Sequence, residues 1–462
     1  MKIICNNSAF RRQSDSKGKE GMILSMEKNK ILVLYSHNPS RLEHLRKLRK
    51  LREKYNITLV LDENVDTSFQ KDYVDNILKV PMKNVYEDID NIVRQIKETI
   101  GIPDGIINIS EMCVPLHSLL CKEFNIIGPS EEVVRIGRNK FEMRAFCKQL
   151  EIPVPKFELL NDNIDQICNN LTFPVVVKPT IGGGSTLVRR FNNKEELIEN
   201  IHSLIQIANE KYKNDALFAK YKDKNGNVPF VVEEIIGGDV LFSTNFPFKV
   251  GEISVESIYY NDEVTVLAIH DKPIPSNGPY FEEYIWSTPT RIPIGLQEKA
   301  KEYVSRIHKK LGKGCYVLHT EFRTFKDDLV LLEFGARLGG GPIYKSLVHS
   351  TKNDYLEILI NLSMGLQPEL SKDKPINTIT HCLWAEKEGK VKQIIGEPKA
   401  IWDAYYCEHQ IYDDIGEIAV RAPKSCRSNG HIVYKGNDIS FDELERRVIK
   451  GLNEFKFITE DE

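Results

Sequence analysis

Long apolar runs and a dominant charge sign are both missing from this 462-residue chain. No stretch of 18 or more apolar residues occurs, so no membrane-spanning helix is predicted and a membrane is not expected as a partner. The opening segment is polar and lacks the apolar core of a signal peptide, so we expect a cytoplasmic protein. The 63 Lys and Arg residues nearly balance 66 Asp and Glu residues, for a net charge of −3, whereas a dedicated nucleic-acid binder normally carries a basic excess. Nucleic acid is therefore not expected as a partner.

The nine cysteines are scattered, odd in number and without a C-x-x-C pair, which argues against a disulfide framework or a zinc knuckle and indicates reduced, packed thiols. Two glycine motifs are also absent. No G-x-G-x-x-G follows the first predicted strand, so a dinucleotide site is not supported, and no Gly-Lys-Ser/Thr completes a Walker A loop. With 41% hydrophobic residues, the chain has enough apolar content for two to four domains.

The first predicted domain covers residues 29–130 and follows a mobile polar tail at residues 1–28. Residues 31–36 (ILVLYS) and 57–62 (ITLVLD) have the composition of buried strands, and between them leucines recur every three residues from Leu42 to Leu51, as on one helix face. Strand, helix and strand at this spacing form a βαβ unit with parallel strands, so we expect a doubly wound α/β domain. The basic residues of the helix indicate a solvated outer face rather than a site for RNA or phosphate.

Three further divisions are expected after a Gly-Pro break near residue 130. Residues 131–230 combine a helix from Glu131 to about Leu150, the strand FPVVVKPT, a glycine loop, a long polar helix and an exposed, charged loop at LFAKYKDKNGNV. Residues 231–366 contain the strand candidates EISVESIYY, EVTVLAIH, YVLHTEFRTF and LVLLEFGAR, which indicate an antiparallel sheet. Residues 367–462 form a C-terminal subdomain of short strands, closed by a helix whose start is signalled by Ser440 and Glu443 in a capping-box pattern. The expected fold class is therefore a multidomain combination of α/β and α+β parts.

Two carboxylates on neighbouring predicted strands carry the first functional signal. Glu321 (LHTEF) and Glu333 (LLEFGAR) stand on the two arms of a predicted hairpin, where they can face the same side of the sheet and repel unless a cation lies between them. Hard oxygen ligands beside phosphate are what magnesium uses. Arg337, four residues later, supplies a planar fork of donors for a phosphate or carboxylate. An edge hairpin with solvated acids is the alternative interpretation of this pair.

A lysine and a glycine loop supply the second signal. Lys178 follows Val177 at the end of an apolar strand. A loop comes next, whose bare backbone amides can approach phosphate oxygens; it contains Gly182, Gly183, Gly184, Ser185 and Thr186. By itself such a loop is also typical of a plain turn. Lys140, on the preceding predicted helix, is either a second phosphate ligand or a surface residue.

Taken in order, these motifs resemble the ATP-grasp superfamily. Lys140 before IPVP, VVVKP with its glycine loop, VVEEIIGGD, HTEF and LLEFGARLGGG occur in the order and approximate spacing of that superfamily, over roughly residues 30–455. The stretch from VESIYYNDEV through AIHDK and FEEYIWSTPT to EFGARLGGG looks like the L-amino-acid ligase branch, which includes the dipeptide synthetase of bacilysin biosynthesis and is similar to carnosine synthase. The resemblance implies an ATP-grasp fold with an N-terminal α/β domain, a small lid subdomain, a large subdomain and a C-terminal extension.

The resemblance also implies roles for matching residues. Lys140 and Lys178 would bind the ATP phosphates, with Lys178 also counted as catalytic, and the loop containing Gly183, Gly184 and Ser185 would close over them. The adenine hinge would comprise Glu233, Glu234 and Ile236, and Asp239 would contact the ribose. Glu321 and Glu333 would hold Mg²⁺, for which Mn²⁺ can substitute. Arg337 would be catalytic by steadying an acyl-phosphate and a tetrahedral intermediate, and Glu283 would be catalytic beside the amino group of a substrate.

Two departures from the family pattern narrow the branch. Many members have Asn two residues after the second glutamate as a further magnesium ligand, whereas this chain has Gly335, like the amino-acid ligases. Trp286 stands where some dipeptide ligases have a histidine near the substrates, which opens the question of substrate identity.

The expected activity is an ATP-dependent carboxylate–amine ligase that joins an amino acid, or a similar small carboxylate, to an amine. It would release ADP and phosphate and act as a monomer or homodimer. Water must be kept from the acyl-phosphate, so the IGGGST loop and residues 276–278 are candidate moving lids. Two alternatives remain open at this point: a ligase with a carrier-protein or peptide acceptor, and a nucleotide-binding regulator without catalysis.

Two histidines call for separate interpretations. His270 and Asp271 are adjacent in IHDK and suggest a dyad, but neighbours on a strand point to opposite faces, which favours a pocket-lining or structural role for His270. His319 alternates with Glu321 and therefore shares its face, as a site residue or as a core histidine.

Overall fold

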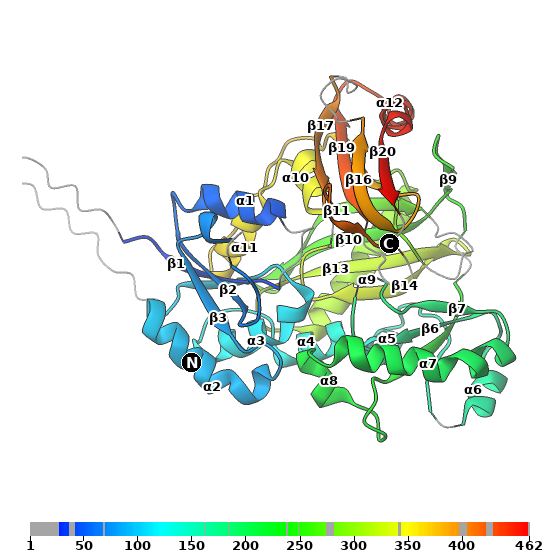
Figure 1. The fold of residues 1–462 in the computed structure, drawn as a ribbon, viewed down its shortest axis with the longest axis horizontal. Coiled ribbons are helices and arrows are strands. Elements are labelled where there is room, and N and C mark those ends of the chain that lie inside the picture. Colours follow the sequence, from blue (N-terminus) through cyan, green and yellow to red (C-terminus); the bar gives the residue numbers. More distant parts are fainter. Residues whose placement is uncertain are drawn as a thin grey trace, which may run out of the picture.

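The computed structural model describes residues 27–36, 42–67, 70–161, 163–183, 185–236, 239–247, 249–273, 281–340, 343–396, 404–421 and 428–460. Most of the predicted N-terminal tail, Gly184 and the candidate lid at residues 276–278 lie outside these ranges. Figure 1 shows three lobes around a long sheet: an N-terminal α/β unit, a lid unit and a C-terminal unit.

The N-terminal unit is the doubly wound α/β structure that the βαβ pattern predicts. Its four strands pair in parallel in the order β3-β2-β1-β4. Its elements are β1 (Lys30–Leu34), α1 (Leu42–Leu51), β2 (Asn56–Asp62), η2 (Gln70–Asp72), β3 (Asn76–Val80), α2 (Val85–Ile100), β4 (Gly105–Asn108), η3 (Glu111–Cys113) and α3 (Val114–Glu123). Leu45, Leu48 and Leu51 of α1 are buried against the sheet, which explains their spacing.

The lid unit surrounds a four-stranded antiparallel sheet in the order β5-β8-β6-β7. Its elements are α4 (Glu131–Arg138), α5 (Lys140–Gln149), β5 (Phe157–Leu159), α6 (Ile164–Asn170), β6 (Val175–Pro179), β7 (Arg189–Phe191), α7 (Lys194–Tyr212), α8 (Ala216–Tyr221) and β8 (Phe230–Glu234). The predicted long helix Lys194–Tyr212 is present as α7, and its buried face packs on the sheet.

Two sequence predictions in this unit are wrong. The single helix expected from Glu131 to about Leu150 is split at Asn139, whose extended backbone ends α4 and whose side chain accepts hydrogen bonds from Phe141 N (3.1 Å) and Glu142 N (3.2 Å) as the N-cap of α5. The stretch expected to be an exposed loop after residue 216 begins with α8, because the Asp215 carboxylate caps it at Leu217 N (2.8 Å).

A nine-stranded sheet forms the centre of the molecule and continues into the C-terminal unit. Its main order is β14-β13-β10-β11-β12-β15-β19-β17, with β9 beside β10. The elements before the C-terminal unit are β9 (Phe242–Ser243), β10 (Lys249–Tyr260), β11 (Glu263–Pro273), β12 (Ile285–Thr288), α9 (Ile294–Leu311), β13 (Tyr316–Phe325), β14 (Asp328–Gly335), α10 (Ile343–Thr351) and α11 (Tyr355–Ser363). All pairings in this sheet are antiparallel, as the strand pattern predicts.

The C-terminal unit adds three strands to the large sheet and a three-stranded sheet of its own in the order β18-β16-β20. Its elements are β15 (Asn377–Leu383), β16 (Gly389–Ile395), β17 (Tyr406–Ile411), β18 (Ile418–Ala419), β19 (Gly430–Gly436), α12 (Phe441–Glu454) and β20 (Lys456–Glu460). The capping prediction is confirmed, because Ser440 Oγ accepts a hydrogen bond from Glu443 N (3.2 Å) at the start of α12.

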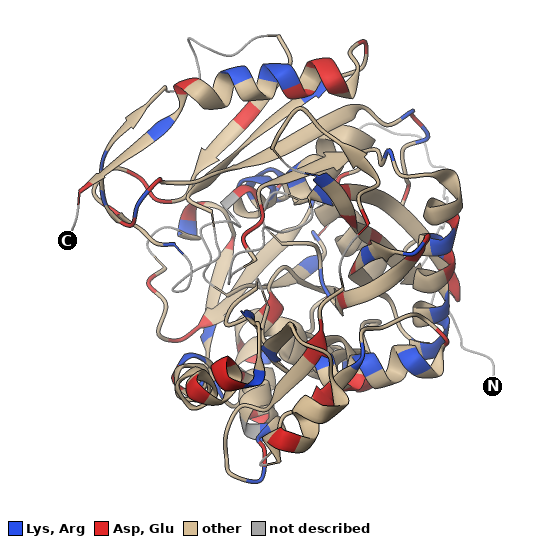
Figure 2. Cartoon of the chain, turned by 90° about the vertical axis from the view of Figure 1, so that its right-hand side faces the viewer, with Lys and Arg blue, Asp and Glu red and all other residues tan. Residues whose placement is uncertain are grey.

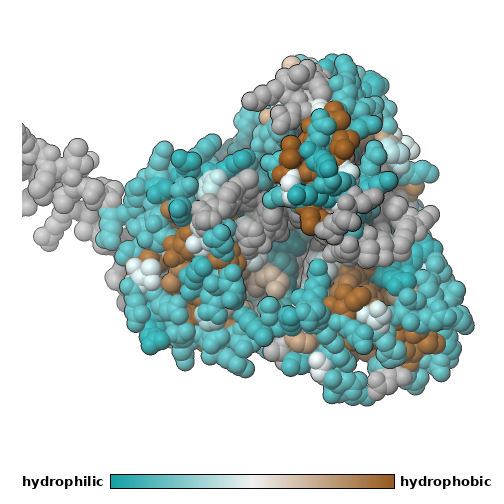
Figure 3. All heavy atoms as spheres, in the orientation of Figure 1, coloured by the Kyte–Doolittle hydropathy of each residue, from teal (hydrophilic) through white to brown (hydrophobic). Residues whose placement is uncertain are grey.

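The surface agrees with the near-neutral composition. Lys and Arg positions are interspersed with Asp and Glu positions along the outer helices rather than gathered by sign (Figure 2). Within the described residues no helix is long and apolar enough to cross a membrane. Figure 3 shows that the molecule is hollowed where the three lobes meet.

Candidate active site

One cavity lies between the lid sheet and the large sheet and contains most of the predicted site residues. It encloses about 860 Å³, part of it open to solvent. The lid side contributes Lys140, Lys178, Gly182, Gly183, Ser185, Glu233, Glu234 and Ile236, and the large-sheet side contributes Glu252, Glu283, Glu321, Arg323 and Glu333. Residues separated by almost 200 positions in the chain thus face each other across a single space.

Two buried lysines define the lid side of the cavity. Lys178, at the end of β6, forms an ion pair with Glu233 (2.7 Å), which is itself paired with Arg144 (2.8 Å). Burial lowers the pKa of Lys178, and the neighbouring Glu233 opposes this shift. Lys140 reaches the same space from the first turn of α5 and contacts the carbonyl of Gly182 (3.0 Å) and Glu333 (3.3 Å). Splitting the helix at Asn139 therefore places an ammonium group beside the glycine loop.

The glycine loop requires glycine at one defined position. Gly182 has φ +108°, and a Cβ atom there would lie 2.3 Å from the hydroxyl of Tyr212, so any side chain would both strain the backbone and clash. Gly183 lies over the side chain of Glu111. Ser185 has φ +53° and lines the cavity, and Gly184 lies outside the described residues. The loop backbone is thus directed along the cavity wall beside both lysines.

Three carboxylates meet on the other side of the cavity, around a lysine that sequence reasoning missed. Oxygen atoms of Glu252, Glu283 and Glu321 lie within 4.8 Å of one another. The ammonium of Lys272 is 2.9 Å from Glu252, 2.5 Å from Glu283 and also contacts Glu321. Burial by itself would lower the pKa of Lys272, but the three carboxylates outweigh it and raise that pKa well above its usual value.

In the same cluster, the pKa values of two carboxyls, Glu283 and Glu321, are shifted in opposite directions. Desolvation within the cavity raises the pKa of Glu283, although 46% of its side chain stays exposed. For Glu321, burial is outweighed by Lys272 and His319, which hold its pKa well below the usual range. Opposite shifts in neighbouring carboxyls are typical of acid–base sites. Glu333 stands directly opposite Glu321 in the β13–β14 ladder and contacts Lys140 rather than Lys272.

His319 extends this charged face, whereas His270 does not form a dyad. His319 Nδ1 contacts Glu256 (2.5 Å) and its Nε2 lies 3.4 Å from Glu321. Although burial disfavours the charged ring, Glu256 and Glu321 raise the pKa of His319 to about 9. His270 is fully buried, and burial lowers its pKa to about 4. Asp271 bonds instead to Thr290 and to Arg291 N (2.9 Å) on the opposite face of the strand.

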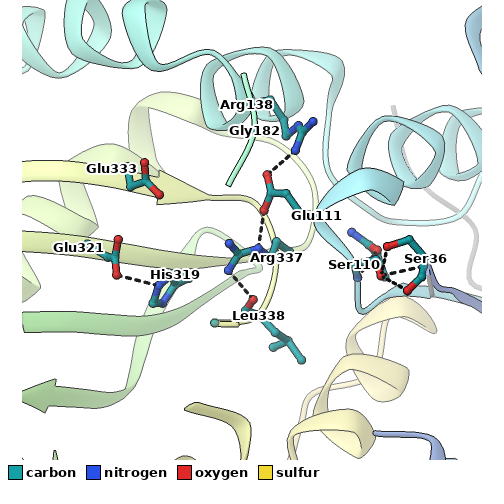
Figure 4. A network of polar contacts seen from close by, with 12 residues as sticks. Ser36, Ser110, Glu111, Arg138, Gly182, His319, Glu321, Glu333, Arg337 and Leu338 are labelled. Atoms are coloured by element: carbon teal, nitrogen blue, oxygen red, sulfur yellow. Dashed lines mark hydrogen bonds and ion pairs between the residues drawn. The ribbon is translucent and has the colours of Figure 1, made fainter. Parts of the chain in front are cut away.

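Arg337 is not among the residues that line this cavity; it lines a second, smaller cavity beside the N-terminal unit and is held by residues outside the predicted set (Figure 4). Its Nε donates to Glu111 Oε2, and its Nη1 donates to the carbonyl of Leu338 (2.7 Å). Glu111 also accepts a hydrogen bond from Arg138 (2.7 Å), a fully buried arginine at the end of α4. Glu111, Arg138 and Lys272 escaped sequence reasoning because each is a single charged residue whose partners are distant in the chain.

Three remaining predicted residues are engaged in contacts within the protein. Asp239 is not among the cavity-lining residues, and its carboxylate accepts a hydrogen bond from Lys326 N at the β13–β14 turn. Glu234 accepts one from Thr172 N (2.8 Å), and the Ile236 carbonyl accepts one from Arg323 (3.1 Å). The ribose role of Asp239 stays a prediction that no contact in the cavity supports. Trp286 is buried on β12 against Ile343 and Cys382.

Comparisons with known proteins agree with this geometry. Residues 171–344 match the family model described as ATP-grasp domain. An L-arginine-specific L-amino acid ligase of Bacillus subtilis is 20% identical over 79% of this chain and 82% of its own length, and an alanine–anticapsin ligase of the same species is 22% identical over 70% and 67%. A crystal structure of an L-amino acid ligase from Bacillus licheniformis superposes with a TM-score of 0.78 at 20% identity, covering 95% of this chain and all of that one. A phosphoribosylglycinamide synthetase from Anaerococcus prevotii gives a TM-score of 0.66 at 17% identity, over 94% of this chain and all of that one.

Proposed function

Because this chain is an ATP-grasp ligase, we propose that it forms an amide bond between a small carboxylate, such as an amino acid, and an amine, with release of ADP and phosphate. The observation that carries the proposal is the composition of the cavity wall. Two lysines and a glycine loop on one side face four glutamates on the other. Cationic side chains and backbone donors opposite a group of oxygen ligands suit a metal-bound polyphosphate. They also suit an activated group that lies beyond the polyphosphate.

The lid side fits the nucleotide. Lys140 and Lys178 are positioned to contact phosphate oxygens, and the amides of Gly183 and Ser185 lie along the same wall. The strand end at Glu233 to Ile236 supplies backbone groups and apolar surface for a purine. The position of these residues on one wall supports these roles. The identity of the base rests on the family pattern.

The carboxylate side fits magnesium by its donor set, since Glu321 and Glu333 are adjacent across the ladder and both line the cavity. When bound there, magnesium would supply charge stabilisation to the transferring phosphoryl group. Lys272 already provides one positive charge to Glu321 and Glu252, and it helps to hold the pKa of Glu321 well below the usual range before any ligand arrives.

The chemistry follows from what these residues can hold. A carboxylate oxygen of the first substrate attacks the terminal phosphorus of ATP, the bond to ADP breaks, and an acyl-phosphate forms. The amine nitrogen of the second substrate then attacks the acyl carbon, and phosphate leaves. Arg337 offers donors to the phosphoryl oxygens. We infer that the carboxylate of Glu283, which lines the cavity beside Lys272, takes the proton that the attacking amine releases.

A direct test combines a substrate matrix with product identification. Phosphate release would be measured with ATP and magnesium against pairs of amino acids and small carboxylates, with nucleotide products resolved and amide masses recorded. We expect ADP and phosphate only when a productive pair is present. AMP with pyrophosphate would contradict the mechanism. Silence across the matrix while ATP still binds would contradict a small-molecule acceptor and favour a carrier protein or peptide.

Two substitutions connect the activity to the site. E333Q and R337A should abolish ADP formation by the productive pair while far-ultraviolet circular dichroism stays unchanged. E298Q is the matched control, because Glu298 is an exposed glutamate whose ion pair with Lys301 lies within α9. Retained turnover in both site variants would refute the assignment of Glu333 and Arg337.

A further inference from the structure

The side chain of Arg337 is oriented by a carboxylate from another part of the molecule. Glu111 lies in η3 of the N-terminal unit, 226 positions away in the chain, and accepts the Nε hydrogen bond of Arg337. With Nη1 bound to Leu338 O, the guanidinium is fixed at two of its three nitrogens. Within the described residues Nη2 has no hydrogen-bond partner, so it is the nitrogen left to meet a ligand.

The topology of the N-terminal sheet explains why Glu111 reaches Arg337. In the order β3-β2-β1-β4, the strands β2 and β3 follow on one side of β1, whereas β4 lies on its other side. At such a reversal of strand order, a crevice opens at the carboxyl ends of the two central strands. Glu111 follows β4 directly. Ser110 fastens this segment to the end of β1, because its Oγ accepts from Ser36 N (2.8 Å) and bonds Ser36 Oγ (2.9 Å) (Figure 4).

A second arginine ties Glu111 to the lid unit. Arg138 donates to Glu111 Oε1 (2.7 Å) and to Asp215 Oδ2 (2.5 Å), and both Arg138 and Asp215 are buried. Asp215 in turn caps α8. The charges therefore alternate from Arg337 through Glu111 and Arg138 to Asp215, and they link the large sheet, the N-terminal unit and the lid unit in one network.

Two glycines leave the space that this network occupies. A Cβ atom at Gly335 would lie 3.5 Å from Glu111 Oε2 and 3.5 Å from Arg337 Cζ, in van der Waals contact with both partners of the ion pair. A Cβ atom at Gly183 would lie 3.5 Å from Glu111 Cγ, so the phosphate-side loop rests on the same glutamate. Gly183 and Gly335 thus both lie beside Glu111 and add no side chain to the space around it.

We propose, on the basis of the function proposed above, that Glu111 is a positioning residue that sets the guanidinium of Arg337 for the phosphoryl group and couples that setting to the seating of the lid. Glu111 itself does not touch the reacting atoms. It acts by fixing Nε so that Nη2 points to one place, which removes the reorganisation that a free arginine would undergo during the reaction. The two arginines lower the pKa of Glu111 to about 2 against the effect of burial, so its charge is constant at working pH.

The decisive variant is E111Q, which keeps the shape and removes the charge. We expect kcat to fall about 10- to 100-fold, as is typical for a lost electrostatic positioning contact, with the KM for ATP and the melting temperature little changed. E43Q is the matched control, because Glu43 is similarly buried and also bridges two units through Lys345 (2.8 Å), away from the cavity. Loss of ATP affinity in parallel with kcat would overturn the positioning role in favour of a purely structural one.

A double variant isolates the coupling. In an R337K background, which lacks the Nε donor, E111Q should cause little further loss. If the two losses in kcat multiply instead, Glu111 does not act through Arg337 and the inference is refuted.

A substrate-free assay separates this inference from the proposed function. ADP, magnesium and aluminium fluoride mimic a transferring phosphoryl group, and retention of ADP on the protein would be measured by gel filtration. If the wild type turns over no substrate pair, the amide-forming proposal fails. Trapping of ADP by the wild type and E43Q but not by E111Q would still support the role of Glu111. Equal trapping by E111Q, or none by the wild type, would overturn it.

Discussion

Replacing Lys272 with methionine should leave carboxylates in the centre of the site without their cation and lower the free energy of unfolding measurably. The Lys272 side chain is 2% exposed and is paired with glutamates on three sides. Removing one member of a buried ion pair typically costs about 3–5 kcal/mol, since the remaining charge stays desolvated. Glu283 is 46% exposed and can be rehydrated, so it adds little to this cost.

Two remaining contacts place the expected loss near the lower end of that range. Glu252 keeps its ion pair with Arg323 (2.9 Å), and Glu321 keeps His319 at 3.4 Å. We therefore expect K272M to lose about 3 kcal/mol. For a cooperative unit of the size of the central region, this corresponds to a decrease in melting temperature of roughly 6–12 °C. The deficit should shrink as the pH falls toward 4, because the stranded carboxylates then become protonated.

Thermal unfolding followed by circular dichroism, in EDTA and in millimolar magnesium, tests this reasoning. Magnesium should restore more stability to K272M than to the wild type, because the ion can replace the missing ammonium among the glutamates. K299M is the control, since Lys299 is 41% exposed and its surface pair with Asp328 (3.2 Å) should contribute about 0–1 kcal/mol. An unchanged melting temperature for K272M in EDTA would refute the claim that Lys272 neutralises the cluster.

Three further perturbations address the loop, the helix break and the C-terminal contact. G182A should weaken ATP binding about tenfold through the clash with Tyr212 and the strained φ, while G226A, at φ +81° with no atom within 4 Å, should bind normally in the same titration; equal affinities for both variants would contradict the clash. N139A should cost about 1 kcal/mol in urea unfolding and raise the KM for ATP, because the cap that positions Lys140 is lost; an unchanged KM would show that the cap does not control that lysine. The Glu408 carboxylate is half-buried, and although burial opposes it, His349 and Lys345 lower its pKa to about 2, so its stabilising effect is present above pH 4.5 and is lost as the pH falls toward 2. E408Q should therefore lower the melting temperature at neutral pH, and the gap to the wild type should close in acid; a gap that is constant with pH would refute the charge argument.

The elements that sequence could predict are those determined by short-range patterns. The α7 boundaries follow from helical periodicity together with the N-cap Asn193, whose side chain accepts from Glu196 N. The glutamate hairpin follows from strand composition and from the turn at Lys326 and Asp327, both at positive φ. In each case the deciding interactions lie within about a dozen residues of each other in the chain, where a pattern can record them.

The features that sequence missed depend on distant contacts. The chain from Glu131 to Leu150 has continuous helical character, and the break at Asn139 is secured by a hydrogen bond from Lys140 N to Thr180 O (2.7 Å), which no local pattern encodes. The role of Glu111 could not be predicted either, because it depends on the hydrogen bond with Arg337, which is distant in the chain. Predicting Lys272 would have required knowing that β11 lies between β10 and β12, so that its lysine faces three glutamates from other segments.

The continuity of the large sheet bears on how the chain can be divided. β12 hydrogen-bonds to β15 over four consecutive residue pairs, so the C-terminal unit extends the large sheet through strand pairing and is not attached by a linker alone. A fragment ending near residue 366 would leave β12 beside β11 with its other edge unpaired, and exposed strand edges of this kind recruit other chains and aggregate. Modular exchange of the C-terminal unit between related ligases would therefore have to carry β12 with it, and a nick in the segment between α11 and β15 would leave the two pieces held together as one folded particle.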